Sequence, residues 1–330
     1  MPQSSYSTIV EAQQWAFSQL ASTSESAHVD AEALLVHCLN KSRSFLYTWP
    51  EKTLTVEQFK NFQQMVKKRQ KGMPVAHIVG EREFWSLPFI VNESTLIPRP
   101  DTEILVETAL NLDVRFNARV LDLGTGTGAI ALSIAHERPK WRITAIDKVP
   151  EAVALAKANR ANLNLEQVEI LQSDWFSAVK DRDFDLIVSN PPYIDERDEH
   201  LHMGDVRFEP QSALTAADEG FADLYHIADK AREHLLPGGF LLLEHGYQQA
   251  IKVRQKLIDL GYKDVATVRD FGSNDNKNSK LRAWLDEKII NQDPQFFTRS
   301  KGAKSRWQTY SPGYFTEKGK TWITMNGETV

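Results

Sequence analysis

The chain has 330 residues, of which 42% are hydrophobic and 25% are charged, and its formal net charge is −5. A chain of this length can bury sizeable cores and is expected to form two domains, while its acidic balance argues against a basic nucleic-acid binder. The single cysteine, Cys38, excludes a disulfide framework. No apolar run is long enough to span a membrane and the start does not resemble a leader, so we expect a cytoplasmic protein.

Residues 1–72 are expected to form a small bundle of helices, because apolar residues recur at helical spacing in three stretches. These stripes lie within residues 9–20, 31–39 and 56–66. Such a bundle is either a purely structural unit or a module that docks a substrate. The basic run at its end, residues 67–71, is explained by the helix C-terminus, which favours positive charge.

Residues 73–100 are expected to be a linker, since glycine and proline recur along it. A hairpin is compatible with residues 83–91, and the linker is expected to lead into a helix capped by Asp101 or Thr102. Arg99 stands between two prolines of this segment. A residue in so rigid a setting is more often structural than catalytic, although Arg99 is placed to border a substrate site.

Strand-like and helix-like segments alternate from residue 101 to residue 271, which predicts an α/β fold with a Rossmann-like, doubly wound, mostly parallel sheet. The first strand, residues 118–123, ends before a helix in a loop made of Gly124, Thr125, Gly126, Thr127 and Gly128. This spacing differs from the G-x-G-x-x-G pattern of a dinucleotide site. Asp122 would repel a polyphosphate and attract a cation, so a sulfonium nucleoside that carries an amino acid fits better.

The next two strands end in residues that suit a nucleoside. Asp147 follows the second strand, where a carboxylate either accepts the two ribose hydroxyls or caps the helix that begins near residue 150. Asp174 and Trp175 follow the third strand, residues 168–172. Asp174 is expected to accept from an adenine amino group and Trp175 to cover the ring; the alternative for Trp175 is a buried ring that only fills space.

The fourth strand, residues 184–189, stops at Asn190 because Pro191 and Pro192 lack the N–H groups that a sheet needs. Ligands bind at the carboxyl ends of strands in an open α/β sheet. The sequence therefore predicts a site for a planar NH2 group, with its hydrogens on the Asn190 side-chain oxygen and the Pro191 carbonyl and its face against Tyr193. His200 and His202 follow, but two histidines without a third ligand predict no metal site.

Several segments carry a resemblance to a known family. They are residues 82–85, 96–103, 121–130, 189–194, 206–210 and 243–246. In them the chain resembles the class I S-adenosylmethionine-dependent methyltransferases, and more narrowly the PrmC/HemK family of protein-(glutamine-N5) methyltransferases. The Asn-Pro-Pro-Tyr tetrapeptide alone is shared with adenine-N6 methyltransferases of DNA and RNA. The segment 96–103 and the helical front domain are more specific to the glutamine enzymes.

The resemblance implies S-adenosylmethionine as cofactor and, as methyl acceptor, the glutamine in the Gly-Gly-Gln loop of class I peptide chain release factors. It implies cofactor contacts at residues 124–128, Asp147, Trp175 and Asn190, and contacts with the substrate amide at residues 190–193. It also favours docking of the release factor on the helical domain. We expect a monomer that binds no nucleic acid directly. The alternatives are an adenine-N6 methyltransferase of DNA or RNA and a cofactor-binding interaction protein that has lost catalysis.

Residues 272–330 depart from the family, whose members end with a short strand that completes the sheet. This divergent tail mixes aromatic and basic residues. The mix fits nucleic-acid binding, a strand-rich appendage, a replacement for the missing strand or the product of an altered reading frame. The departure puts the completeness of the sheet in question.

Overall fold

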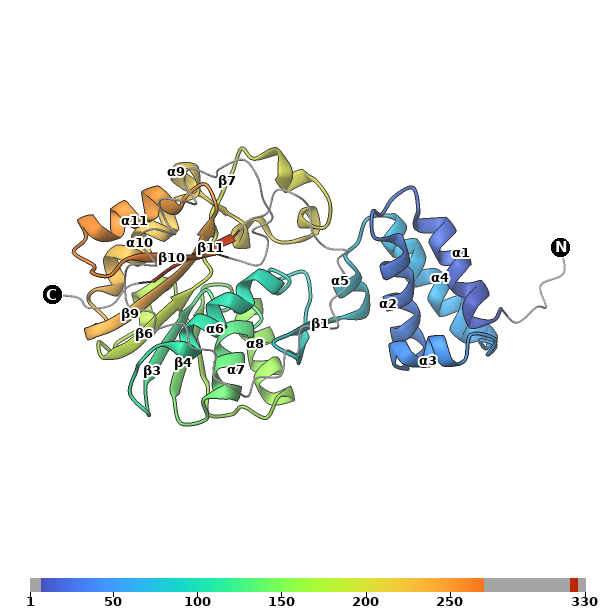
Figure 1. Ribbon diagram of the computed structural model, residues 1–330, viewed down its shortest axis with the longest axis horizontal. Coiled ribbons are helices and arrows are strands. Elements are labelled where there is room, and N and C mark those ends of the chain that lie inside the picture. Colours follow the sequence, from blue (N-terminus) through green and yellow to red (C-terminus); the bar gives the residue numbers. More distant parts are fainter. Residues whose placement is uncertain (1–6, 270–320, 326–330) are drawn as a thin grey trace, which may run out of the picture.

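A computed structural model describes residues 7–269 and 321–325 of the chain. Figure 1 shows two parts, a group of helices on the N-terminal side and a twisted sheet with helices on both faces. This arrangement confirms the predicted fold class, an α/β doubly wound sheet preceded by a small all-helical part. No helix within the described ranges is long and apolar enough to cross a membrane.

The N-terminal part is a bundle with its own apolar core. Its helices are α1 (Ile9–Leu20), α2 (Ala27–Leu39), α3 (Arg43–Thr48), α4 (Val56–Gln70) and α5 (Val75–Val79). Capping boxes begin α1 and α4: Thr8 and Thr55 accept from the backbone three residues on, while Glu11 and Gln58 reach back. Val56 is the first residue of the third apolar stripe expected from the sequence, residues 56–66, but its side chain is 72% exposed. As the first residue of α4 it has no preceding turn for its side chain to cover.

A hairpin joins the bundle to the sheet. Its strands are β1 (Glu81–Phe84) and β2 (Leu87–Ile90). Trp85 and Ser86 form the turn, and their φ angles of 53° and 58° are both left-handed. Two successive left-handed residues make the turn type that matches the twist of a hairpin. One aromatic residue from each strand, Phe84 and Phe89, is buried in the core of the larger part, so the hairpin packs with the sheet.

The central sheet is mostly parallel. Its strands stand in the order β10 (Ala266–Arg269), β11 (Thr321–Met325), β9 (Leu235–Gly246), β6 (Phe184–Ser189), β3 (Arg119–Leu123), β4 (Arg142–Asp147) and β5 (Glu169–Gln172). Strands β9, β6, β3, β4 and β5 run parallel, and β11 runs antiparallel to both of its neighbours. The chain order reverses beside β3, and such a switch point is where ligands bind in open α/β sheets.

Helices cover both faces of the sheet (Figure 1). They are α6 (Glu103–Asn111), α7 (Ala129–Glu137), α8 (Pro150–Asn162), α10 (Ala222–Ala231) and α11 (Ala250–Asp259). Alternate residues of β6 face the two layers: Leu186 and Val188 join the core that includes α6–α8, and Ile187 joins the core that includes α10 and α11. All of β6 is buried, because a parallel strand between two helical layers is covered on both faces.

Short elements form the loops around the sheet and the bundle. They are the 3₁₀ turns η1 (Pro100–Thr102), η2 (Trp175–Ala178), η3 (Glu199–His202), η4 (Val206–Phe208) and η5 (Gln211–Ala213), the strands β7 (Ile194–Asp195) and β8 (Thr215–Ala216), and α9 (Ala217–Gly220). Strands β7 and β8 pair in parallel, so the segment that directly follows β6 and the tetrapeptide lies beside the segment that precedes α9.

Strand β11 lies between β10 and β9, where the sequence analysis left the completeness of the sheet in question. Its register sets Ile323 opposite Glu244 of β9 and opposite Val268 of β10. For residues 321–325, therefore, the tail replaces the missing strand. Residues 270–320 and 326–330, which carry most of the aromatic and basic residues of the tail, lie outside the described residues.

Candidate active site

The loop between β3 and α7 is shaped by its glycines. Gly124, Gly126 and Gly128 have φ angles of 71°, 55° and 84°, which lie in the left-handed region that favours glycine. A Cβ atom on Gly128 would also lie 2.9 Å from Leu132 Cδ1. The loop therefore exposes backbone, with no side chain at alternate positions, directly at the end of the central strand.

Asp147, at the end of β4, holds this loop and the next helix together. One carboxylate oxygen accepts the Gly126 amide and the other accepts the Val149 amide, both at 2.9 Å. Val149 is the N-cap residue of α8, and α8 has no side-chain cap, so the bond from Val149 to Asp147 is a local turn bond and not a helix cap. Each carboxylate oxygen can accept a further hydrogen bond, so these two bonds are compatible with ribose binding. Burial raises the pKa of Asp147.

Asn190 follows β6, and Thr102 sets the orientation of its amide. Asn190 Nδ2 donates to Thr102 Oγ1 at 3.2 Å. Thr102 is buried in η1, just before α6, so a residue far away in the sequence orients the motif. Because the NH2 half of the amide is engaged, Oδ1 is the half of the side chain that faces away from Thr102 and can accept a hydrogen bond.

The rest of the tetrapeptide follows β6 without regular secondary structure. Pro191 is buried and Pro192 is partly exposed. Tyr193 packs against the core that includes α10 and α11, and its carbonyl accepts Gln249 Nε2 at 3.0 Å. A Cβ atom on Gly220 would lie 2.2 Å from that carbonyl. A glycine at position 220 is therefore required for the backbone to approach Tyr193 so closely.

A cavity of about 310 Å³ brings most of the predicted residues together. The predicted residues in its wall are Arg99, Gly124, Thr125, Gly126, Thr127, Asp147, Trp175, Asn190 and Pro192. Other predicted residues, all within the described part of the chain, do not line it; they are Gly128, Asp174, Pro191 and Tyr193. Their roles as ligands stay predictions.

Trp175 and Asp223 of α10 both line the cavity. The ring of Trp175 lies 3.5 Å from the position of a Cβ atom on Gly124, so it covers the start of the glycine loop. Burial raises the pKa of Asp223, while the neighbouring Trp175 side chain acts in the opposite direction. Sequence analysis missed Asp223, because an acid in the first turn of a helix belongs to no motif. The Asp174 side chain is 61% exposed and forms an ion pair with Lys148 at 3.8 Å.

A buried acid lies beneath the glycine loop. Asp122 is fully buried; one of its oxygens accepts the Thr125 hydroxyl at 2.6 Å and the Ala131 amide at 3.3 Å. Burial raises the pKa of Asp122 to about 7. Together with Asp147 and Asp223, this carboxyl places acidic groups in or beneath the wall of the cavity, an arrangement that favours a cation over a phosphate.

Arg99 reaches the cavity from the linker segment. Its Nη2 group donates to both oxygens of Glu209, at 2.7 and 2.9 Å. The Glu209 side chain is fully buried, and burial raises its pKa while the charge of Arg99 acts in the opposite direction. Arg99 thus lines the cavity with its guanidinium held by a partner in the loop that follows the tetrapeptide.

Metal ligands do not gather anywhere in the ranges that the structure describes: no group of three or more histidine, cysteine, aspartate or glutamate side chains there could hold an ion. His200 lies in an exposed loop, where its Nδ1 is 2.6 Å from Asp198 Oδ1. His202 lies at the end of the same 3₁₀ turn.

The chain matches two family models and closely similar bacterial proteins. A model described as the methyltransferase small domain matches residues 100–213, and one described as the PrmC N-terminal domain matches residues 11–80. A release factor glutamine methyltransferase of Shewanella oneidensis is 77% identical over 269 residues, which are 82% of this chain and 94% of that protein. The protein of that name from Escherichia coli is 54% identical over 269 residues, 81% of this chain and 97% of its own. That from Vibrio cholerae is 51% identical over 255 residues, 77% and 89% of the two chains.

Proposed function

This chain belongs to the release factor glutamine methyltransferases, and from that premise we propose the reaction that its cavity supports. The enzyme transfers a methyl group from S-adenosylmethionine to the side-chain amide nitrogen of a glutamine in a release factor. The acceptor is the glutamine of the Gly-Gly-Gln loop of class I release factors. One observation carries the proposal: the Asn190 amide, oriented by Thr102, shares a cavity with the glycine loop and Asp147.

The residues of the cavity fit S-adenosylmethionine. The glycine loop allows a ligand to approach its backbone, and Asp147 and Trp175 line the same cavity. In this proposal Asp147 accepts the ribose hydroxyls and the ring of Trp175 packs on adenine. The acidic groups at Asp122, Asp147 and Asp223 complement a positively charged ligand. When bound, S-adenosylmethionine supplies an electrophilic methyl group on a sulfonium. Asp174, which is exposed and pairs with Lys148, is proposed to contribute to cofactor binding at the rim of the cavity.

Asn190 and the Pro191 carbonyl hold the acceptor amide. An amide nitrogen is a poor nucleophile because its lone pair is delocalised into the carbonyl. Acceptors on both N–H bonds fix the nitrogen in line for transfer and favour the geometry in which the lone pair becomes available. Positioning of this kind can supply on the order of 7–11 kcal/mol. Tyr193 is proposed to flank the planar amide.

The nitrogen loses its proton after the methyl has been transferred. An N-methylated amide cation is strongly acidic, so the proton leaves without a strong base. A catalytic carboxylate is therefore not required, and the acids of the cavity are free to serve ligand binding. The Asn190 and Pro191 oxygens, which hold the N–H bonds, are the first groups to which the proton is exposed.

The bundle of α1–α5 is proposed to dock the release factor beside the cavity. We further propose that the enzyme acts as a monomer and that nucleic acid is not its substrate. Adenine methylation is the alternative that the tetrapeptide permits. The relatives from Shewanella oneidensis, Escherichia coli and Vibrio cholerae are named for the glutamine reaction, which favours it over adenine methylation.

A transfer assay tests this function. The purified protein is incubated with methyl-labelled S-adenosylmethionine and a release factor, beside a copy of that factor whose loop glutamine is changed to alanine. The proposal predicts label on the first factor and none on the second. Label on both, or on neither while the enzyme is folded and binds the cofactor, would contradict it.

A further inference from the structure

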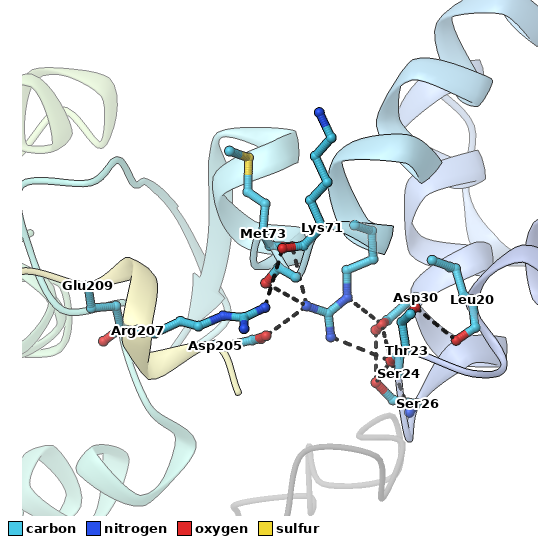
Figure 2. Close-up of polar contacts among 12 residues, drawn as sticks. Leu20, Thr23, Ser24, Ser26, Asp30, Lys71, Met73, Asp205, Arg207 and Glu209 are labelled. Carbon is cyan, nitrogen blue, oxygen red and sulfur yellow. Dashed lines mark hydrogen bonds and ion pairs between the residues drawn. The ribbon is translucent and has the colours of Figure 1, made fainter. Parts of the chain in front are cut away.

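Residues 205–209 form a strut between the two parts of the molecule. The strut is the 3₁₀ turn η4 with Asp205 before it and Glu209 after it. Asp205 pairs with Arg69 of the bundle, and Glu209 pairs with Arg99 at the cavity. One turn of chain therefore connects the bundle to the cavity. Figure 2 shows Asp205 and Arg207 reaching from this turn toward the segment that follows α4.

Arg69, in the last turn of α4, makes the bundle end of the strut. Its Nε group donates to Asp30 at 2.6 Å and its Nη1 group donates to Asp205 at 2.7 Å. Arg69 is 8% exposed and Asp30 is 0% exposed. Because Asp30 already compensates the buried charge of Arg69, the second pair is not needed to neutralise it. The pair with Asp205 instead ties the loop to the bundle.

Arg207 makes a second contact with the same helix end. Its Nη2 group donates to the Lys71 carbonyl at 3.3 Å, where the end of a helix carries partial negative charge. Its guanidinium also lies over the ring of Phe208, 5.0 Å from the centroid. Gly72 makes room for this arrangement: its φ is 91°, and a Cβ atom there would lie 1.7 Å from Arg207 Nη2. Any side chain at position 72, just beyond the end of α4, would therefore displace the Arg207 guanidinium.

The other end of the strut reaches the wall of the cavity. Glu209 is held by Arg99, which lines the cavity, and the chain then continues through η5 and β8, parts of which also line it. Strand β8 pairs with β7, and the Ile194 amide donates to the Leu214 carbonyl at 3.0 Å. Displacement of the strut would therefore displace one wall of the cavity and the residues that directly follow Tyr193.

We propose that Asp205 and Arg207 are positioning residues that couple the helical bundle to the acceptor site. The inference rests on the proposed function, in which a release factor contacts the bundle while its glutamine enters the cavity. A substrate docked on the bundle is then held at a distance from Asn190 that the strut sets. Loss of the strut leaves the cofactor side of the cavity intact but puts the glutamine out of line, and small misplacements of a reacting group have large effects on rate.

The variant Asp205→Ala tests the coupling. Asp205 makes no side-chain capping bond to η4, and Arg69 keeps Asp30 as its partner, so the variant is expected to fold. The proposal predicts that kcat for a release factor falls about tenfold while KM stays within about twofold. The dissociation constant of S-adenosylmethionine stays unchanged, and the melting temperature stays within about 3 °C, as for a partly exposed ion pair.

Asp198→Ala is the matched control, because Asp198 lies in the same loop but pairs with His200 inside that loop. Its kcat is expected to stay near that of the wild type. The double variant Asp205→Ala/Arg207→Ala is expected to lose little more than either single variant, since residues that act through one element are not additive. Amide hydrogen exchange over residues 211–216 is expected to rise in Asp205→Ala and not in Asp198→Ala.

An unchanged kcat and unchanged exchange in Asp205→Ala would overturn the coupling, as would losses of equal size in the Asp198→Ala control. A wild-type enzyme that fails to methylate the release factor would contradict the proposed function instead. In that case amide hydrogen exchange over residues 211–216 still decides whether Asp205 ties the bundle to the cavity wall.

Discussion

The amide of Asn190 is oriented by a bond that its own motif does not contain. Thr102 accepts from Asn190 Nδ2 at 3.2 Å, so the residue proposed to hold the acceptor depends on the start of α6. We predict that Asn190→Ala loses nearly all turnover, by at least about a hundredfold, because an oriented acceptor is lost. The measurement is kcat on a release factor, with the circular dichroism melting curve as the check on folding.

Thr102→Val is the graded companion to that variant. It keeps the shape of the side chain and removes only the hydroxyl that fixes Asn190, so a loss of about tenfold in kcat is expected. Near-normal turnover of folded Asn190→Ala would contradict the proposed role of this residue. Equal losses in both variants would instead show that orientation of the amide accounts for the whole effect.

Asp122 predicts a pH dependence of cofactor binding. Burial raises the pKa of Asp122 to about 7, and a bound cation favours the ionised carboxylate. Below pH 7 the free protein carries a proton there that binding must expel, so affinity falls as the pH is lowered from 8 to 6, by at most about tenfold per unit. Calorimetric titration at several pH values measures this. The Asp122→Asn variant is expected to show a shallower dependence, and the same slope in both proteins would contradict the assignment.

Some residues of the cavity can be predicted from the local sequence, and others cannot. Gly124, Asp147 and Asn190 each stand at the end of a predicted strand, so the rule that ligands bind at the carboxyl edge of the sheet finds them. Thr102 and Asp223 reach the same cavity from helix starts far away in the sequence. Their positions depend on how helices pack over the sheet, which periodicity does not specify.

The β1–β2 hairpin contains a turn whose residues are poorly matched to its geometry. Ser86 has a φ of 58° at a position where glycine is favoured. We predict that Ser86→Gly raises the free energy of unfolding by about 0.5–1 kcal/mol, because the left-handed strain is removed. Chemical denaturation measures the change. Ser86→Ala keeps the strain and serves as the control; a gain of the same size from alanine would refute the explanation.

Strand β11 predicts that the end of the chain contributes to stability. It pairs with both β9 and β10, so its removal would expose ladder hydrogen bonds on two strands. Deletion of residues 321–330 is expected to lower the free energy of unfolding by on the order of 3 kcal/mol, at about 1 kcal/mol for a hydrogen bond. Deletion of residues 326–330 alone leaves the strand in place and is the matched control. Equal stability of the two truncated proteins would contradict the pairing.

Elements with strong patterns are predictable, and those fixed by distant partners are not. The parallel strands and the helices between them follow from buried runs and helical spacing, and the structure confirms that fold class. The short helix α3 and strand β11 do not follow in this way. The first has one buried residue, Leu46, and the second is separated from its partner β10 by the residues 270–320. A strand of that kind forms because unpaired backbone groups of β9 and β10 are available to it, which the local sequence does not show.

At the scale of the whole molecule, the bundle and the sheet meet through charged side chains that lie far apart in the sequence. Arg69 and Asp205 are separated by 136 positions, and Arg99 and Glu209 by 110. The sequence is compatible with a docking role for the bundle, but it does not reveal which residues connect the bundle to the cavity. The contact requires the folded arrangement of both parts (Figure 1).

The position of the transferred methyl group is the most direct test of the account. A release factor is incubated with the enzyme and S-adenosylmethionine in the presence of RNA and DNA, and the products are mapped by mass spectrometry. We predict one added methyl group on the side-chain amide of the loop glutamine, with the nucleic acids unmodified. A methyl group on another residue, or on an adenine, would contradict the assignment of the cavity around Asn190.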